Sequence, residues 1–152
     1  MARIVSIVNQ KGGVGKTTTA VNLSASLAVA GRKILLIDLD PQANATTGLG
    51  IDKKNLRQSV YKYIMDPDTS TDGIIPTMID KFFLLPSNSE LVGAEVELVD
   101  AEDRAFRLKR FIERVKGDYD FIIIDSPPSL GLLTLNSIVA SEGIMITLQC
   151  EF

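Results

Sequence analysis

The stretch Asn9-Gln10-Lys11-Gly12-Gly13-Val14-Gly15-Lys16-Thr17-Thr18 decides the fold of this 152-residue chain. It follows an apolar run at residues 4–8, which predicts a strand, and it precedes a helical pattern that begins near Lys16. Glycines at positions 12, 13 and 15 allow backbone N–H groups to turn inward around an anion, and the helix that follows adds the positive end of its dipole. The stretch therefore predicts a phosphate-binding loop between a strand and a helix.

The residue types within this loop predict distinct roles. Phosphate-binding loops place a lysine on the β- and γ-phosphates of a nucleotide and the next hydroxyl residue on Mg²⁺, and Lys16 and Thr17 match those positions. The glycine usual five residues before the Gly-Lys pair is replaced by Gln10, and a second lysine, Lys11, stands beside it. The predicted nucleotide-binding residues are Lys11, Gly12, Gly13, Val14, Gly15, Lys16, Thr17 and Thr18.

The composition is typical of one globular domain, here residues 1–152, with 45% apolar and 23% charged residues. The net charge of −3 indicates no overall basic field. The single cysteine, Cys150, fits a reducing cytoplasm, and the apolar run after Arg3 is too short for a signal peptide. No stretch predicts a membrane span. Because the chain has no histidine, any hydrolysis would use carboxylates, lysines, backbone amides and a bound metal.

Alternation of strand and helix patterns predicts an α/β fold with a parallel sheet. A helix is expected at residues 17–30, with Gly31 just past its end, and a strand buried on both faces at 33–39. The remaining predictions are a polar loop at 41–50, helices at 59–65, 89–99, 101–115 and 130–140, and strands at 74–78, 82–85, 121–124 and 144–148.

Three aspartates lie at the carboxyl ends of two predicted strands. Asp38 and Asp40 come at the carboxyl end of the strand at 33–39, where open α/β sheets bind ligands. Asp125 follows four apolar residues, the pattern of a Walker B carboxylate that holds Mg²⁺ through water. The alternative is that these acidic residues merely end strands. The basic residues at 104–116 predict a solvated helix face, with a nucleic-acid patch as the alternative.

Three blocks, at residues 11–18, 36–44 and 122–128, resemble the ParA/MinD family of deviant Walker ATPases, most closely its ParA (Soj-like) partitioning branch. Ala43, where the family often has glycine, is a minor departure. The resemblance implies a mostly parallel twisted sheet with helices on both faces. It also implies ATP and Mg²⁺ as ligands, a homodimer that forms with ATP and binds DNA without sequence preference, and a ParB-type partner that stimulates hydrolysis. The expected location is the cytoplasm, on the nucleoid, and the expected role is chromosome or plasmid partitioning.

The resemblance also implies roles for individual residues. Lys11 would reach the partner's ATP across the dimer, and Lys16 would hold the phosphates. Thr17 would ligate Mg²⁺, with Asp38 and Asp125 supporting its water shell, and Asp40 would orient the attacking water. Lys11, Lys16 and Asp40 are thus the expected catalytic residues.

Family members continue for roughly another hundred residues, so this chain is expected to be an N-terminal portion of the family's fold. Two alternatives stay open. One is a MinD-like, membrane-associated division-site ATPase, although no amphipathic C-terminal helix is present. The other is a nucleotide-binding fragment without turnover. An iron–sulfur carrier is disfavoured because only one cysteine is available.

Overall fold

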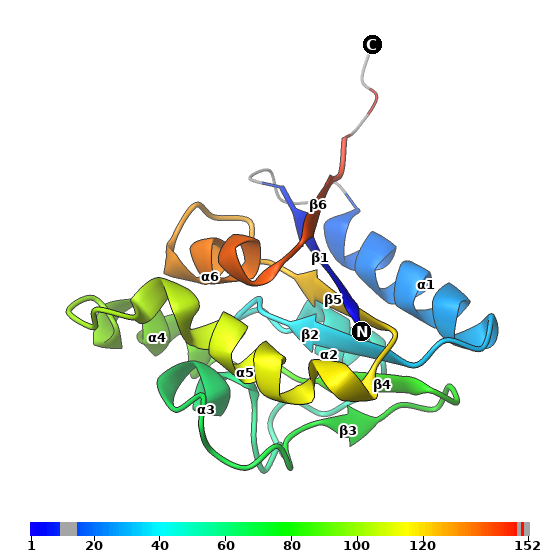
Figure 1. Ribbon diagram of the computed structural model, residues 1–152, viewed down its shortest axis with the longest axis horizontal. Helices are drawn as coiled ribbons and strands as arrows, with labels where there is room; N and C mark the ends of the chain where they lie inside the picture. Colours follow the sequence, from blue (N-terminus) through cyan, green and yellow to red (C-terminus); the bar gives the residue numbers. More distant parts are fainter. Residues whose placement is uncertain (10–14, 149, 151–152) are drawn as a thin grey trace.

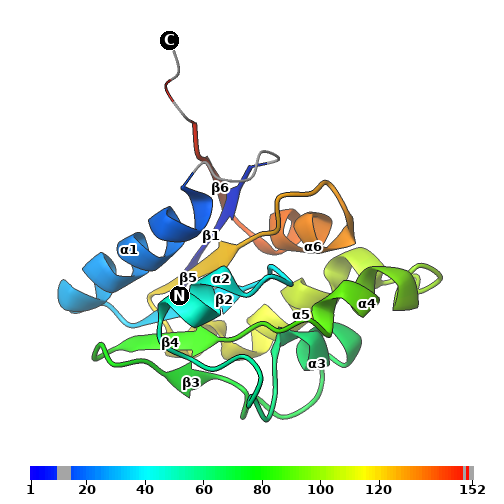
Figure 2. The same cartoon turned by 180° about the vertical axis from the view of Figure 1, so that it is seen from behind.

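The fold is a mostly parallel sheet with helices packed on both of its faces (Figures 1 and 2). The computed structural model describes residues 1–9, 15–148 and 150. Within them, six strands form one sheet in the order β3-β4-β2-β5-β1-β6, in which only β3 runs antiparallel to its neighbour. The strands are β1 (Arg3–Val8), β2 (Ile34–Asp38), β3 (Ile75–Pro76), β4 (Phe82–Leu85), β5 (Phe121–Asp125) and β6 (Gly143–Ile146). The predicted α/β fold class is confirmed.

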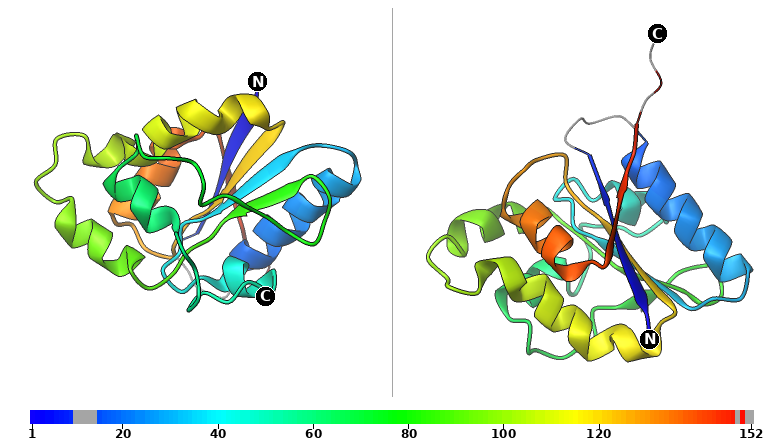
Figure 3. Two further views of the ribbon diagram at one scale, coloured as in Figure 1. Left: turned by 90° about the horizontal axis from the view of Figure 1, so that it is seen from below. Right: turned by 45° about the horizontal axis from the view of Figure 1, so that its top comes forward.

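Helices cover the sheet unequally. Figure 3 shows α1 and α2 on one face and α3 to α6 on the other, which gives the expected three layers. The helices are α1 (Lys16–Val29), α2 (Asn44–Gly48), α3 (Val60–Met65), α4 (Leu91–Glu97), α5 (Arg107–Val115) and α6 (Leu132–Ala140). Two short 3₁₀ helices, η1 (Arg104–Phe106) and η2 (Lys116–Asp118), flank α5.

The position of strand β2 between two helical layers explains why its sequence is continuously apolar. Leu35 and Ile37 point into the core beneath α3 to α6, whereas Ile34 and Leu36 point into the core beneath α1 and α2. All four side chains are fully buried. A strand between two helical layers has no solvent face, so the alternation of polar and apolar residues disappears.

The segment 41–50 departs from the prediction of a polar loop, because it contains α2. Its sequence, Asn-Ala-Thr-Thr-Gly, has no apolar period that would predict a helix. The helix is held instead by tertiary contacts: the carboxylate of Asp38 accepts hydrogen bonds from both the backbone N–H and the hydroxyl of Thr46. Ala43, the residue before the helix, has a left-handed backbone with φ of 57°, a conformation that glycine adopts more readily. This explains why glycine suits the position.

Other boundaries differ from the predictions at the ends of elements. The strand predicted at 74–78 is reduced to the two residues of β3, on the sheet edge, where the missing N–H of Pro76 is tolerated. The helix predicted at 101–115 is divided into η1 and α5. Helix α6 begins at Leu132 rather than 130, and β6 ends at Ile146 rather than 148.

Among the described residues, no helix has the length and apolar character needed to cross a membrane.

Candidate functional site

The candidate site lies at the carboxyl ends of the two neighbouring strands β1 and β5. Strand β1 ends at Val8, and the chain re-enters the described structure at Gly15, whose left-handed backbone (φ 78°) is the N-cap of α1. Lys16 is the first residue of that helix. The predicted loop residues Lys11, Gly12, Gly13 and Val14 lie outside the described residues. The described end of the predicted phosphate loop is therefore the N-terminus of α1. A helix N-terminus favours the binding of anions.

Lys16 and Thr17 both contact the same carboxylate. Lys16 Nζ lies 2.8 Å from Asp125 Oδ1, and Thr17 Oγ1 donates a hydrogen bond of 2.9 Å to Asp125 Oδ2. Lys16 is 7% exposed and Asp125 is fully buried. Thr18, one position further along α1, is exposed. The structure therefore joins the first turn of α1 to the end of β5, although more than a hundred residues separate them in sequence.

Burial and the neighbouring cation have opposite effects on the pKa of Asp125. Burial raises the pKa of the Asp125 carboxyl, while Lys16, and then the hydroxyl of Thr17, oppose that rise. A buried ion pair is held in place only when hydrogen bonds satisfy its remaining atoms. Here each oxygen of the carboxylate has its own donor.

Asp38 and Asp40 lie beside this cluster on strand β2 and just after it. Asp38 is the register partner of Asp125, and Leu39 N–H donates to the backbone carbonyl of Asp125 at 2.9 Å. Burial raises the pKa of the Asp38 carboxyl to about 7. The charge of the nearby Asp125 adds to this rise, whereas the hydrogen bonds from Thr46 oppose it. Within the described part of the chain, the hydrogen bonds of the Asp38 carboxylate run to Asp40 and Thr46, not to Lys16 or Thr17. Asp40 is 5% exposed, and its Oδ1 accepts a bond of 3.0 Å from the N–H of Gln42.

The donor atoms at this edge fit Mg²⁺ bound together with phosphate groups. Mg²⁺ is commonly held by one or two protein oxygens, with waters and phosphates completing its octahedron. The hydroxyl of Thr17 and the carboxylate of Asp125 are such oxygens, and they lie side by side. No group of three or more His, Cys, Asp or Glu side chains able to hold a metal by itself occurs among the described residues. The site therefore offers two neighbouring oxygens to a metal that arrives with a nucleotide.

Thr46 and Ser87 belong to the same edge and were not predicted. Both are fully buried, and both hydrogen-bond to the Asp38–Asp40 segment. Neither lies in a recognisable motif: Thr46 stands in a polar stretch without period, and Ser87 follows the end of β4. Only the parallel arrangement of β2 and β4 brings the two together.

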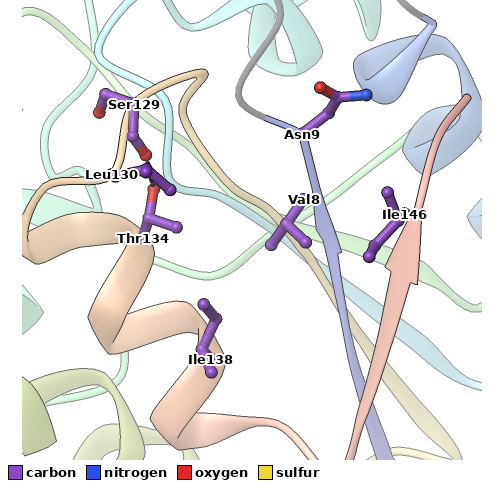
Figure 4. A pocket seen from close by; sticks show the side chains of 7 residues that line it. All are labelled: Val8, Asn9, Ser129, Leu130, Thr134, Ile138 and Ile146. Carbon is purple, nitrogen blue, oxygen red and sulfur yellow. Dashed lines mark hydrogen bonds between the residues drawn. The ribbon is translucent and has the colours of Figure 1, made fainter.

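An apolar cavity of about 180 Å³ lies next to the candidate site, between β1, β6 and α6 (Figure 4). Its lining residues are Val8, Asn9, Ser129, Leu130, Thr134, Ile138 and Ile146. The described lining is mostly aliphatic and includes no lysine or arginine, whereas phosphate sites commonly use such cations. None of the described residues of the predicted phosphate loop, 15–18, lines this cavity.

The arginines of α5, a candidate nucleic-acid patch, contact the end of α3, the loop that follows it and Asp103. Arg107 Nη1 donates to the carbonyl of Met65 at 2.9 Å, and Arg114 Nη1 donates to that of Thr69 at 2.7 Å. Arg110 pairs with Asp68 and, at 2.9 Å, with Asp103. These contacts, with Arg110 and Arg114 exposed, favour the predicted solvated helix face over the nucleic-acid alternative.

Comparison with known proteins identifies one family model, an AAA domain (AAA_31), that matches residues 2–152. The sporulation initiation inhibitor protein Soj of Bacillus subtilis is 52% identical over 152 residues, and the match covers 100% of this chain and 60% of Soj. The chromosome partitioning protein ParA of Myxococcus xanthus is 49% identical, with 100% of this chain and 54% of that protein covered. The chain thus spans 54–60% of the length of these two relatives.

A solved structure shares the fold closely. It is described as cobyrinic acid a,c-diamide synthase from Mycobacterium smegmatis with a bound ATP analogue and magnesium. The TM-score is 0.96 with 41% sequence identity, and the match covers 100% of this chain and 62% of that one.

Proposed function

The chain belongs to the AAA_31 family of AAA domains, and from that membership we propose that it is the nucleotide-binding domain of a partitioning ATPase. In this proposal, residues 1–152 form one domain that binds ATP with Mg²⁺, and the whole protein hydrolyses ATP to ADP and phosphate. The observation that carries the proposal is the contact of Lys16 and Thr17, at a helix N-terminus, with the carboxylate of Asp125.

The similar proteins support two parts of the proposal, namely nucleotide binding and a role in partitioning. Soj and ParA are named for sporulation control and chromosome partitioning, whereas the M. smegmatis structure is named as a synthase. That structure holds an ATP analogue and magnesium, which are also what the charges at Lys16 and Asp125 favour. The two curated relatives have the higher identities, 52% and 49% against 41%, so we take partitioning as the role of the whole protein.

We assign the phosphates to the loop 11–18, with Lys16 on the β- and γ-phosphates and Thr18 as a further contact. Thr17 would ligate Mg²⁺, and Asp38 and Asp125 would accept hydrogen bonds from its waters. Mg²⁺ bound there would neutralise charge that develops on the transferred phosphoryl group. Because Lys16 and Thr17 now bond to Asp125, nucleotide binding would redirect these two donors toward phosphate and metal.

We assign Asp40 to the positioning of the attacking water and Lys11 to a contact with the nucleotide of a second subunit. Phosphoryl transfer depends mainly on positioning and charge stabilisation, which carboxylates and lysines can supply without histidine. The whole protein would then be an ATP-dependent homodimer that binds DNA without sequence preference, meets a ParB-type partner and works in the cytoplasm on the nucleoid.

Isothermal titration with ATP and Mg²⁺ tests the nucleotide site. The full-length Lys16→Ala variant should lose measurable binding, because the ammonium that neutralises the phosphates is gone. Lys109→Ala is the matched control, since Lys109 is an exposed lysine on α5, and it should bind like the wild type. Melting temperatures of both variants show whether the fold is intact. Unchanged ATP affinity in a folded Lys16→Ala protein would remove Lys16 from this role.

Co-sedimentation separates the proposed function from the MinD-like alternative. The full-length protein with ATP should sediment with DNA of arbitrary sequence and not with liposomes. Binding to liposomes alone would favour the membrane-associated alternative instead.

A further inference from the structure

A connected set of buried hydrogen bonds joins the end of β2, the helix α2 and the segment after β4. Thr46 lies at its centre: its Oγ1 donates to Asp38 Oδ2 at 2.7 Å, and its backbone N–H donates to the same oxygen at 2.9 Å. The backbone N–H of Ser87 in turn donates to Thr46 Oγ1 at 3.0 Å. Asp38, Thr46 and Ser87 are all fully buried, so water does not compete for these bonds.

The same set holds the backbone on both sides of Asp40. Ser87 Oγ donates to the carbonyl oxygen of Asp40 at 2.7 Å, and the N–H of Asp40 donates to Asp38 Oδ1 at 3.2 Å. The N–H of Ala43 also donates to the carbonyl of Asp40, at 2.9 Å. The peptide groups that flank Asp40 are therefore tied to β2, to the segment after β4 and to the turn that leads into α2.

Helix α2 depends on this arrangement for its own start. Ala43 precedes the helix and has no side chain that could cap it. Thr46 is the third residue of the helix, the position whose N–H a capping side chain normally satisfies. Asp38 supplies that cap from the adjacent strand, and through Thr46 it links α2 to the strand that pairs with β5 and Asp125.

We infer that Thr46 and Ser87 are positioning residues that hold Asp40 in place for ATP hydrolysis. This inference rests on the proposed function, in which Asp40 orients the attacking water. Buried hydrogen bonds in a low dielectric fix atoms closely, and a displacement of about 1 Å of a reacting group can cost on the order of 100-fold in rate. Loss of the Thr46 hydroxyl would leave the N–H of Ser87 and one oxygen of Asp38 without this partner, and the segment around Asp40 would relax.

Steady-state ATPase kinetics of the full-length protein test the inference. Thr46→Val keeps the shape of the side chain but lacks the hydroxyl, and kcat should fall about 10- to 100-fold. Thr46→Ser, which keeps the hydroxyl, should restore most of kcat. Thr47→Val is the matched control, because Thr47 is the exposed neighbour on the same helix, and its kcat should equal that of the wild type.

Two further readouts distinguish positioning from a purely structural effect. The Kd for a non-hydrolysable ATP analogue should change less than about 3-fold in Thr46→Val, since Lys16 and Thr17 hold the phosphates in the proposed site. In an Asp40→Ala background, adding Thr46→Val should cause no further loss of kcat, because residues that act as a unit are not additive. If Thr46→Val does not fold, Ser87→Ala provides the same test, since it removes only the hydroxyl that bonds to the Asp40 carbonyl.

The outcomes separate this inference from the proposed function. Wild-type kcat in Thr46→Val and Ser87→Ala, or losses that multiply with that of Asp40→Ala, would overturn the positioning role and leave the ATPase proposal standing. Wild-type turnover in Asp40→Ala would overturn the role of Asp40 and, with it, this inference. A wild-type protein that binds ATP but does not hydrolyse it would refute the enzyme activity itself.

Discussion

At the residue scale, two buried carboxylates lie side by side at the carboxyl ends of neighbouring strands. Asp38 and Asp125 are register partners on neighbouring strands, and both are fully buried. Among the described residues, Asp125 pairs with a cation, Lys16, whereas Asp38 accepts hydrogen bonds from the N–H and hydroxyl groups of Thr46 and from the N–H of Asp40. Such an arrangement is costly for folding, and shifted carboxyl groups of this kind gather at functional sites.

The Asp38 carboxyl should make stability depend on pH near neutrality. Its pKa rises from 3.8 to about 7 because it is buried, so the folded state holds more protons than the unfolded state across that window. The free energy of unfolding should therefore fall as pH rises from about 4 to 7, with a slope approaching about 1.4 kcal/mol per pH unit from this group. Urea denaturation of wild type and Asp38→Asn at several pH values measures the slope, which should be shallower in the variant. Parallel slopes in the two proteins would contradict the assignment to Asp38.

At the element scale, the C-terminus of α1 is capped by a motif that Gly31 in the sequence indicates. Gly31, predicted just past the helix, has φ of 89°, and its N–H donates to the carbonyl of Ala28 at 2.9 Å. The N–H of Arg32 donates to the carbonyl of Leu27 at 3.0 Å. These two bonds form a Schellman motif, which satisfies carbonyls that the helix leaves unpaired. The motif turns the chain toward β2 and so sets the crossover that brings Asp38 to the site.

Gly31→Ala should lower the free energy of unfolding by about 1 kcal/mol, because an alanine in the left-handed region is strained. Nothing lies within 4 Å of the added methyl group, so steric contact does not contribute. Gly117→Ala is the matched control: it has equal space and no left-handed backbone, and it should change stability by about 0.5 kcal/mol or less. Equal stability of the two variants by urea denaturation would show that backbone conformation is not the cause.

At the scale of the whole molecule, the strand order gathers the candidate residues. Strand β1 is flanked by β5 and β6, and β5 separates β1 from β2. From β1 the chain continues to β2, and from β5 it continues to β6, so the two connections run in opposite directions across the sheet. Open α/β sheets bind ligands at the carboxyl ends of the strands where this direction reverses. Lys16, Asp38, Asp40 and Asp125 all lie near this point.

The proposed dimer predicts that Lys11 acts on the nucleotide of the other subunit. Full-length Lys11→Ala and Lys16→Ala proteins should each be inactive, but their mixture should recover part of the ATPase activity. A heterodimer would contain one site with an intact Lys16 and a Lys11 donated by its neighbour. Crosslinking first establishes that heterodimers form. Given heterodimers, a mixture without any recovered activity would falsify the trans role of Lys11.

The sequence by itself determined the fold class, most element positions and the phosphate-loop prediction. Strands β1, β2, β4 and β5 were predicted almost to their ends, because apolar runs and flanking glycines are local signals. The same local signals singled out Lys16, Thr17, Asp38, Asp40 and Asp125 as candidate site residues. The roles of these residues, and of Lys11, stay predictions until the variants are measured.

Only the tertiary structure decided which of these groups bond to one another. It revealed α2 in a stretch predicted as a loop, the bonds of Lys16 and Thr17 to Asp125, and the links from Thr46 and Ser87 to the Asp38–Asp40 segment. The physical reason is that these bonds join residues 8 to 109 positions apart along the chain. No local propensity encodes such contacts, because they form only when parallel strands place their carboxyl ends at one edge of the sheet.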